Sequence, residues 1–170
     1  MIKPAKLVMM TLMGFSLVGV SACGFQPLYA DRGLVTSLSQ VDIVVPDTRT
    51  GYFLKQDLSK GLLEDAKAAK RYRLDVQLTE RRFAVGLGLD DTASRYEISN
   101  AVAYSLAYSL TDLATRQVVY KSNFVDATTY DAAESPYASM ASQSDGQERA
   151  AISISQKIQA DLALYFHNMK

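Results

Sequence analysis

The chain has 170 residues, with 18 Lys and Arg against 18 Asp and Glu, one His and one Cys. This balance lacks the basic excess of nucleic-acid-binding domains, so we expect no nucleic-acid partner. One Cys and one His cannot supply the several such ligands of a typical zinc site, so we expect no metal.

The first 22 residues have the three zones of a secretory signal peptide. Lys3 and Lys6 provide positive charge, and the run from Leu7 to Val20 is almost entirely apolar. Its 14 residues would span about 21 Å as a helix, which is short for a hydrocarbon core of about 30 Å. We therefore interpret residues 1–22 as a signal peptide and not as a permanent membrane span.

The single Cys follows this run directly. The stretch Val20-Ser21-Ala22-Cys23 resembles the bacterial lipobox, in which cleavage leaves Cys as the first residue of the mature protein. The resemblance implies that Cys23 carries a covalent S-diacylglycerol and N-acyl lipid, and we expect no other cofactor. Two or more acyl chains anchor a protein stably. Gly24 stands where Asp would resemble an inner-membrane retention signal, so we expect the outer membrane, on its periplasmic side.

The mature chain suits a single domain. Removing residues 1–22 takes away two Lys and no acid, which leaves 148 residues with 16 basic and 18 acidic side chains, a net charge of −2. We expect residues 23–40 to form a lipidated tether and residues 41–170 to form one domain. The chain has ten Tyr, and because Tyr is favoured at interfaces, we expect some of them at a partner surface.

The mature chain begins with a strand and a helix. Val41 to Val45 is a β-branched run that Pro46 ends, which predicts a strand. The next segment, residues 49–68, reads as a helix because Leu recurs every four residues in it. Asp47 or Thr48 can cap its start. Gly61, inside this helix, would allow a close approach to the sheet.

Three strands are expected next, at residues 72–78 with a continuation toward 85, at 96–110, and at 118–129. The middle one alternates over fifteen residues, about 50 Å of extended chain, whereas ordinary strands have three to ten residues. It must therefore bend, bulge or project beyond the core. One of its faces carries Tyr96, Ile98, Asn100, Val102, Tyr104, Leu106, Tyr108 and Leu110, and the other carries only Glu97 and small Ser and Ala residues.

A helix is expected from about Asp145 to His167, because Asp145 and Glu148 have capping-box spacing before an apolar stripe. The order of elements predicts an α+β fold, a two-layer sandwich. It has an about four-stranded, mainly antiparallel sheet with two helices packed on one face. The helices should cover the face with the large apolar residues, which leaves the Ser and Ala face free.

Catalytic chemistry is not expected. The stretch GLGLDD at 86–91 lacks the Lys and Ser or Thr of a phosphate-binding loop. His167, the residue that a Ser triad would need, lies three residues from the C-terminus. Asp90 and Asp91 read as a polar turn. We therefore expect a protein that is not an enzyme.

Three arginines flank the expected loop at 86–92, namely Arg81, Arg82 and Arg95. Strand pairing would bring them to one end of the sheet, and guanidinium groups suit phosphate. They are candidates for binding the anionic head group of a glycolipid. The alternative is a set of solvated strand-end arginines balanced by Glu80, Asp90 and Asp91.

The chain resembles the LPS-assembly lipoprotein LptE family, in its alphaproteobacterial branch. The resemblance is carried by Cys23-Gly24-Phe25-Gln26-Pro27-Leu28-Tyr29, by the order of elements, and by the tail from Glu148 to Phe166. It implies an outer-membrane lipoprotein that plugs the β-barrel LptD, assists its assembly, and binds lipopolysaccharide (LPS) during its insertion into the outer leaflet. The alternative is an auxiliary lipoprotein of a lipid ABC-transport system.

Overall fold

The computed structural model divides the chain into two units, residues 1–30 and 31–170. It describes residues 32–87, 97–131 and 135–169, all of which belong to the second unit. Cys23 and Arg95 lie outside the described residues.

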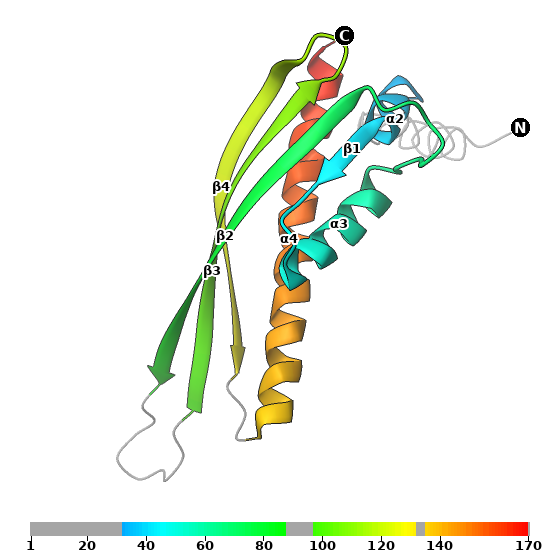
Figure 1. Cartoon of the computed structure of the whole chain (residues 1–170). Helices are drawn as coiled ribbons and strands as arrows, with labels where there is room; N and C mark the ends of the chain where they lie inside the picture. Colours follow the sequence, from blue (N-terminus) through cyan, green and yellow to red (C-terminus); the bar gives the residue numbers. More distant parts are fainter. Residues whose placement is uncertain (1–31, 88–96, 132–134, 170) are drawn as a thin grey trace, which may run out of the picture. The chain divides into compact units, whose positions relative to one another are not determined.

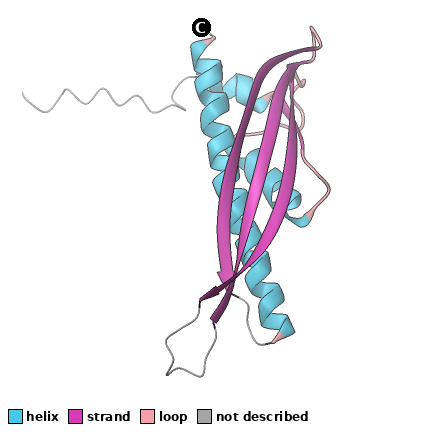
Figure 2. Ribbon diagram, turned by 90° about the vertical axis from the view of Figure 1, so that its left-hand side faces the viewer, coloured by secondary structure: helices cyan, strands magenta, loops and turns pink. Residues whose placement is uncertain are grey.

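The second unit consists of one sheet and a layer of helices. Its elements are α2 (Arg32–Ser39), β1 (Val41–Val44), α3 (Arg49–Gly61), β2 (Tyr72–Leu87), β3 (Glu97–Asp112), β4 (Gln117–Asp131) and α4 (Pro136–Asn168). The sheet has the order β1-β2-β3-β4, with β1 parallel to β2 and the other pairs antiparallel. The helices lie on one face of the sheet (Figures 1 and 2). The predicted α+β, two-layer fold is confirmed.

The core lies between the helices and one face of the sheet. Alternate residues of β2 and β3 point toward the helices because successive side chains of a strand face opposite sides. The sheet contributes Tyr72, Leu74, Val76, Val102, Tyr104, Leu106, Tyr108 and Leu110, and α4 contributes Ala150, Ile154, Ile158, Leu162 and Phe166, all of them buried. Fully burying one such aliphatic side chain stabilises the fold by about 1.5–3 kcal/mol.

Several tyrosines belong to this core and not to an exposed interface. The Tyr72 ring packs on Phe166 with centroids 5.0 Å apart. The Tyr108 hydroxyl donates to Asp161 Oδ2 at 2.5 Å. The aromatic body is thus buried while the polar tip is satisfied by α4. Tyr52 and Tyr137 are exposed, at 66% and 85%.

The long strands are matched by a long helix. The 16 residues of β3 extend about 53 Å, and the 33 residues of α4 extend about 50 Å. The sheet also shifts register at its hairpin end, where Leu110 pairs with Tyr120 but Thr111 pairs with Val118. This leaves Val119 as an additional residue on β4. The irregularity is therefore a bulge beside the hairpin, in the partner strand β4 and not in the long strand β3 itself.

The helix α4 begins nine residues before the expected Asp145. Ser135 is its N-cap and accepts a hydrogen bond from the Ala138 N–H at 3.1 Å, with Pro136 in the first turn. Pro is favoured at this position because its missing N–H would have no helical partner. Asp145 is inside the helix, so the expected capping box does not form there.

The segment expected to be a tether contains a helix. Leu34 and Leu38 of α2, four residues apart, are buried in the core. The fold thus begins before residue 41. In contrast, α3 ends at Gly61 and not at 68, because the chain leaves the helix at Leu62 and Leu63, the latter with φ of 54°.

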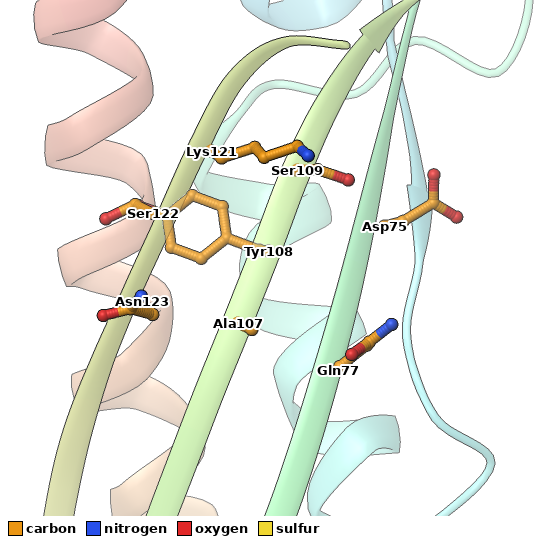
Figure 3. A pocket seen from close by; sticks show the side chains of 8 residues that line it. All are labelled: Asp75, Gln77, Ala107, Tyr108, Ser109, Lys121, Ser122 and Asn123. Carbon is orange, nitrogen blue, oxygen red and sulfur yellow. The ribbon is translucent and has the colours of Figure 1, made fainter.

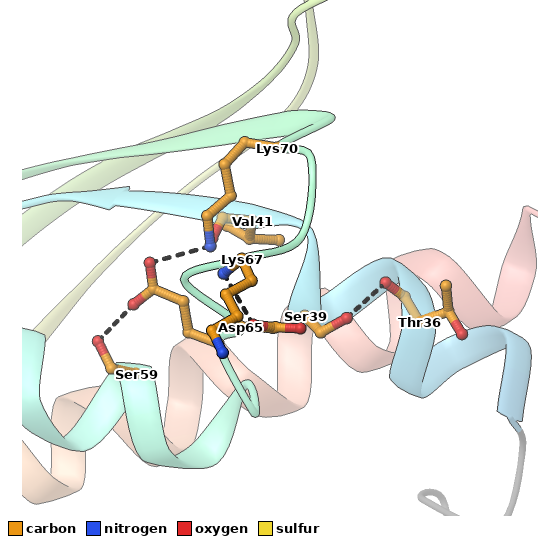
Figure 4. A network of polar contacts seen from close by, with 8 residues as sticks. Thr36, Ser39, Val41, Ser59, Asp65, Lys67 and Lys70 are labelled. Carbon is orange, nitrogen blue, oxygen red and sulfur yellow. Dashed lines mark hydrogen bonds and ion pairs between the residues drawn. The ribbon is translucent and has the colours of Figure 1, made fainter.

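A polar network ties this exit to β1 (Figure 4). Lys70 Nζ donates to the Val41 carbonyl at 3.3 Å and pairs with Glu64 at 3.1 Å, and Glu64 accepts from Ser59 at 2.7 Å. Burial alone would raise the pKa of Glu64, but the hydrogen bonds from Ser59 and Lys70 outweigh it and lower the pKa. The network fixes the connection that places β2 beside β1.

Candidate functional site: the outer face of the sheet

The sheet face opposite the helices, here called the outer face, is free of the described helices, as predicted. Its central strand β3 presents the small residues Ala101, Ala103, Ser105, Ala107 and Ser109. On one side β2 presents Arg73, Asp75, Gln77, Thr79, Arg81 and Phe83, and on the other β4 presents Lys121, Asn123, Val125, Ala127 and Thr129. Small residues between two rows of larger ones make a shallow channel along β3.

The channel deepens into a cavity of about 350 Å³ toward the end of the sheet where β3 turns into β4 (Figure 3). It is lined by Asp75, Gln77, Ala107, Tyr108, Ser109, Lys121, Ser122 and Asn123. Two strand spacings separate its polar sides, roughly 10 Å. We call it the outer groove.

The outer groove is polar and carries both charges. Asp75 pairs with Arg73 at 3.0 Å. Lys121 extends from β4 toward Ser109 of β3 (Figure 3). It makes no ion pair with any residue that the structure describes. The amides of Gln77 and Asn123 add hydrogen-bond donors and acceptors to the groove. Its floor of Ala107 and Ser109 is low enough for a ligand or partner to come close to the β3 backbone.

The candidate arginines do not form one cluster. Arg81 pairs across the sheet with Ala103 and is exposed on the outer face. Arg82, the next residue, points to the helix side, where it lines a cavity with Glu80 and Gln143. Consecutive strand residues face opposite sides, so strand geometry itself separates the two. Arg95 lies outside the described residues.

Arg82 is also engaged within the fold. Its Nε donates to Glu80 Oε1 at 2.8 Å. The Gln143 amide, oriented with its oxygen toward Arg82, accepts from Nη1 and Nη2 at 3.1 and 2.9 Å. The hydrogen bond to Glu80 raises the pKa of Arg82. Arg82 thus links β2 to α4. Of the candidate arginines that the structure describes, Arg81 is therefore the one that faces a ligand on the outer face.

A second polar layer lies beneath the sheet beside Arg82. The Thr50 hydroxyl donates to Glu80 Oε2 at 3.3 Å. The Tyr104 hydroxyl is fully buried, with Thr50 next to it, but it completes no hydrogen bond of good geometry with a described residue. Burial raises the pKa of Tyr104 to about 12.

The described part of the chain holds neither a metal-binding cluster nor a membrane-spanning helix. No group of three or more His, Cys, Asp or Glu side chains there could hold a metal ion. No helix there is both long and apolar enough to cross a membrane.

The residues that line the outer groove were not identified from the sequence. The alternation of β3 predicted the free face, but the groove depends on which residues of β2 and β4 lie beside Ala107 and Ser109. That register places Asp75 and Lys121 on either side of Ser109. A bulge in β4 shifts the pairing, so counting back from the hairpin turn would misplace Lys121 by one residue.

Comparison with solved structures identifies the class of protein. A lipoprotein of Caulobacter crescentus matches with a TM-score of 0.67 and 35% sequence identity, over 81% of this chain and 98% of that chain. The chain therefore belongs to the same lipoprotein family as the Caulobacter protein. A minor lipoprotein of Acinetobacter baumannii matches at 14% identity with a TM-score of 0.49, over 74% of this chain and 89% of that one, which is too weak to carry an argument.

Two other comparisons give no match. No protein-family model and no curated protein matches the chain.

Proposed function

We propose that this lipoprotein is the outer-membrane LptE component of the LPS translocon. In this proposal Cys23 carries the lipid anchor, the protein plugs the β-barrel LptD and assists its assembly, and it binds LPS during insertion into the outer leaflet. It acts without catalysis and without a cofactor other than its lipid.

The observation that carries the proposal is the uncovered outer face. Face-to-face sheets pack about 10 Å apart when ordinary side chains interdigitate, and small residues allow a closer approach. The floor of Ala103, Ser105 and Ala107 would let the curved inner wall of a barrel approach β3, while the flanking polar side chains hydrogen-bond to a polar lumen. The hairpin of β3 and β4 is long, and α4 covers its other face (Figure 1), which suits an element inserted into a barrel lumen.

Two further observations support the proposal. The first is the family relationship to a lipoprotein. The second is the stretch from Cys23 to Tyr29, which resembles the N-terminus of the LptE family. The identity of the partner decides between the barrel and the ABC-transport system.

The test is affinity purification of the tagged full-length lipoprotein from detergent-solubilised membranes. We expect a large β-barrel to co-purify. Recovery of inner-membrane transport components would favour the auxiliary role in lipid ABC transport, and recovery of the lipoprotein alone would contradict both.

A steric variant tests the face itself. Ala107 is exposed on the floor of the outer groove, and Gln156 is exposed on α4. Ala107→Trp should lower the yield of co-purified barrel, because the indole holds the wall away from the sheet. Gln156→Trp is the matched control, which adds the same side chain on the helical side. Equal loss from both variants would remove the outer face as the contact surface.

A further inference from the structure

The outermost strand β4 presents a row of unpaired backbone groups. The hydrogen-bond pattern shows which β4 residues point their backbone groups outward. The Tyr72 N–H donates to the Gln40 carbonyl, so the backbone groups of Tyr72 point toward β1. Residues of a strand alternate in the edge to which their N–H and C=O groups point. The registers of β2 with β3 and of β3 with β4 extend this alternation to β4. The backbone groups of Phe124 and Asp126 therefore point toward β3. Those pointing toward the open edge belong to Lys121, Asn123, Val125, Ala127 and Thr129.

An independent contact supports this assignment. Arg149 of α4 donates from Nη2 to the Thr129 carbonyl at 3.1 Å. A helix side chain can reach this carbonyl because it points away from β3.

The ends of the edge are closed but its centre is open. The bulge at Val119 ends regular pairing at one end, and Arg149 occupies the carbonyl of Thr129 at the other. Between them, the backbone groups of Asn123, Val125 and Ala127 make no hydrogen bond outside the sheet with a described residue. These residues are exposed, Val125 at 65%.

The usual protections of an edge strand are weak in this centre. Natural edges are protected by Lys or Pro on the edge, by bulges, by inward-pointing charges or by a covering element. Lys121 and the bulge at Val119 lie at one end of this edge and not in its centre. The segment from Ser122 to Ala127 contains no Pro. Its inward charge, Asp126, is neutralised by Lys157 at 2.6 Å. Unpaired N–H and C=O groups at a two-residue spacing are complementary to one kind of partner, an extended peptide backbone.

We propose that the open edge of β4 pairs with a strand of the barrel partner before the barrel closes, an inference that rests on the proposed function. Between the bulge at Val119 and the Arg149 contact at Thr129, the residues from Tyr120 to Thr128 form an edge of nine residues, the length of a short membrane strand of about 9–11 residues. A closed barrel has no free edge. The pairing therefore belongs to assembly, when the strand edges of the barrel are still open, and it is released on closure.

Proline substitution tests the edge without disturbing the sheet. Pro is tolerated on an edge strand where the N–H faces outward, so Val125→Pro and Ala127→Pro should each fold while removing one donor. We expect barrel assembly in cells to slow about three- to tenfold, the loss that corresponds to one or two backbone hydrogen bonds. The readout is the heat-modifiable, folded barrel in a pulse–chase experiment with the full-length lipoprotein.

The matched control is Ala66→Pro. Ala66 is exposed in the turn that the Ala68 N–H closes onto the Asp65 carbonyl, and Pro is favoured at the second position of such a turn. It should leave assembly unchanged. Circular dichroism melting of each purified variant establishes that it is folded. Unchanged assembly with both folded edge variants would overturn the inference.

Photo-crosslinking separates the inference from the proposed function. A photoreactive residue at position 125 should give an adduct with the barrel early in the chase that disappears as the barrel folds. Two outcomes would overturn the edge pairing alone. One is an adduct between two lipoprotein copies, and the other is the absence of a barrel adduct while the wild-type lipoprotein still co-purifies with the barrel. No barrel with the wild type at any time would contradict the proposed function instead.

Discussion

Arg81 and Arg82 are neighbours in the chain, but their side chains point to opposite faces of the sheet. Arg81 is exposed beside Ala103 on the outer face. Arg82 pairs with Glu80 at 2.8 Å on the helix side. A double substitution would therefore mix a change in ligand binding with a change in the fold, and the two arginines must be tested separately.

The first prediction concerns Arg81. Arg81→Glu should weaken LPS binding by the purified lipoprotein several-fold, because it reverses the charge beside the small-residue floor. The free energy of unfolding should change by less than about 0.5 kcal/mol, as is usual for a surface position. LPS-binding titration and urea unfolding measure the two quantities. Unchanged LPS affinity would remove Arg81 from the candidate site.

The second prediction concerns Arg82. Arg82→Glu places a second carboxylate next to Glu80 and removes the contact to Gln143. Because the Arg82 side chain is half exposed, solvent screens the pair and the loss of stability should be no more than about 1 kcal/mol. Urea unfolding measures it. Adding Glu80→Gln should restore part of the loss; failure of this rescue would argue against repulsion as the cause.

The third prediction compares two buried tyrosines in the same strand. Tyr108 donates to Asp161, whereas the Tyr104 hydroxyl completes no good hydrogen bond with a described residue. Tyr108→Phe should cost about 1.5–3 kcal/mol, since it removes a hydrogen bond to a carboxylate. Tyr104→Phe should be neutral within about 0.5 kcal/mol, because no satisfied bond is lost. Equal losses in urea unfolding would contradict the difference in bonding.

The sequence predicted the layers of the fold because alternation is a local property. The buried side of β3, from Val102 to Leu110, follows directly from its period of two. The free outer face follows from the same pattern. The parallel pairing of Val41 with Tyr72 and the resulting strand order are not local, and they depend on how the crossover through α3 returns to the sheet.

The errors also have physical causes. The stripe formed by Leu34 and Leu38 in α2 is too short to show a period. The first nine residues of α4 are mostly small and polar, and they carry no apolar stripe that would signal a helix. The separation of Arg81 and Arg82 could have been inferred, because adjacent residues in a strand always face opposite sides.

The fourth prediction uses two glycines in α3. A Cβ at Gly51 would lie 2.0 Å from the Pro46 carbonyl oxygen, which belongs to the backbone and cannot move freely. A Cβ at Gly61 would meet the end of the Gln159 side chain. Gly61 therefore allows a close approach to α4 and not, as expected from the sequence, to the sheet.

Gly51→Ala should therefore lower stability by about 1–3 kcal/mol through overpacking. Gly61→Ala should be tolerated within about 1 kcal/mol, because Gln159 can turn away and Ala favours helix. Thermal unfolding of both variants measures the difference. A Gly61→Ala variant as unstable as Gly51→Ala would show that Gln159 cannot rearrange.

The fifth prediction concerns alkaline pH. Burial raises the pKa of Tyr108, and it raises that of Tyr104 from 10.0 to about 12. A folded-state pKa above the unfolded value means that the unfolded chain loses its proton first. The stability contributed by the protonated form is therefore fully present below about pH 10 and is lost as the pH rises toward 12.

For Tyr104 alone the loss amounts to no more than about 3 kcal/mol, at about 1.4 kcal/mol per pKa unit. The wild type should unfold at progressively lower urea concentration between pH 10 and pH 12. Tyr104→Phe should flatten this dependence, because it removes a titrating group from the core while leaving the ring in place. Tyr52→Phe is the matched control, since Tyr52 is exposed. Identical slopes for Tyr104→Phe and wild type would show that the Tyr104 hydroxyl titrates alike in the folded and unfolded chains.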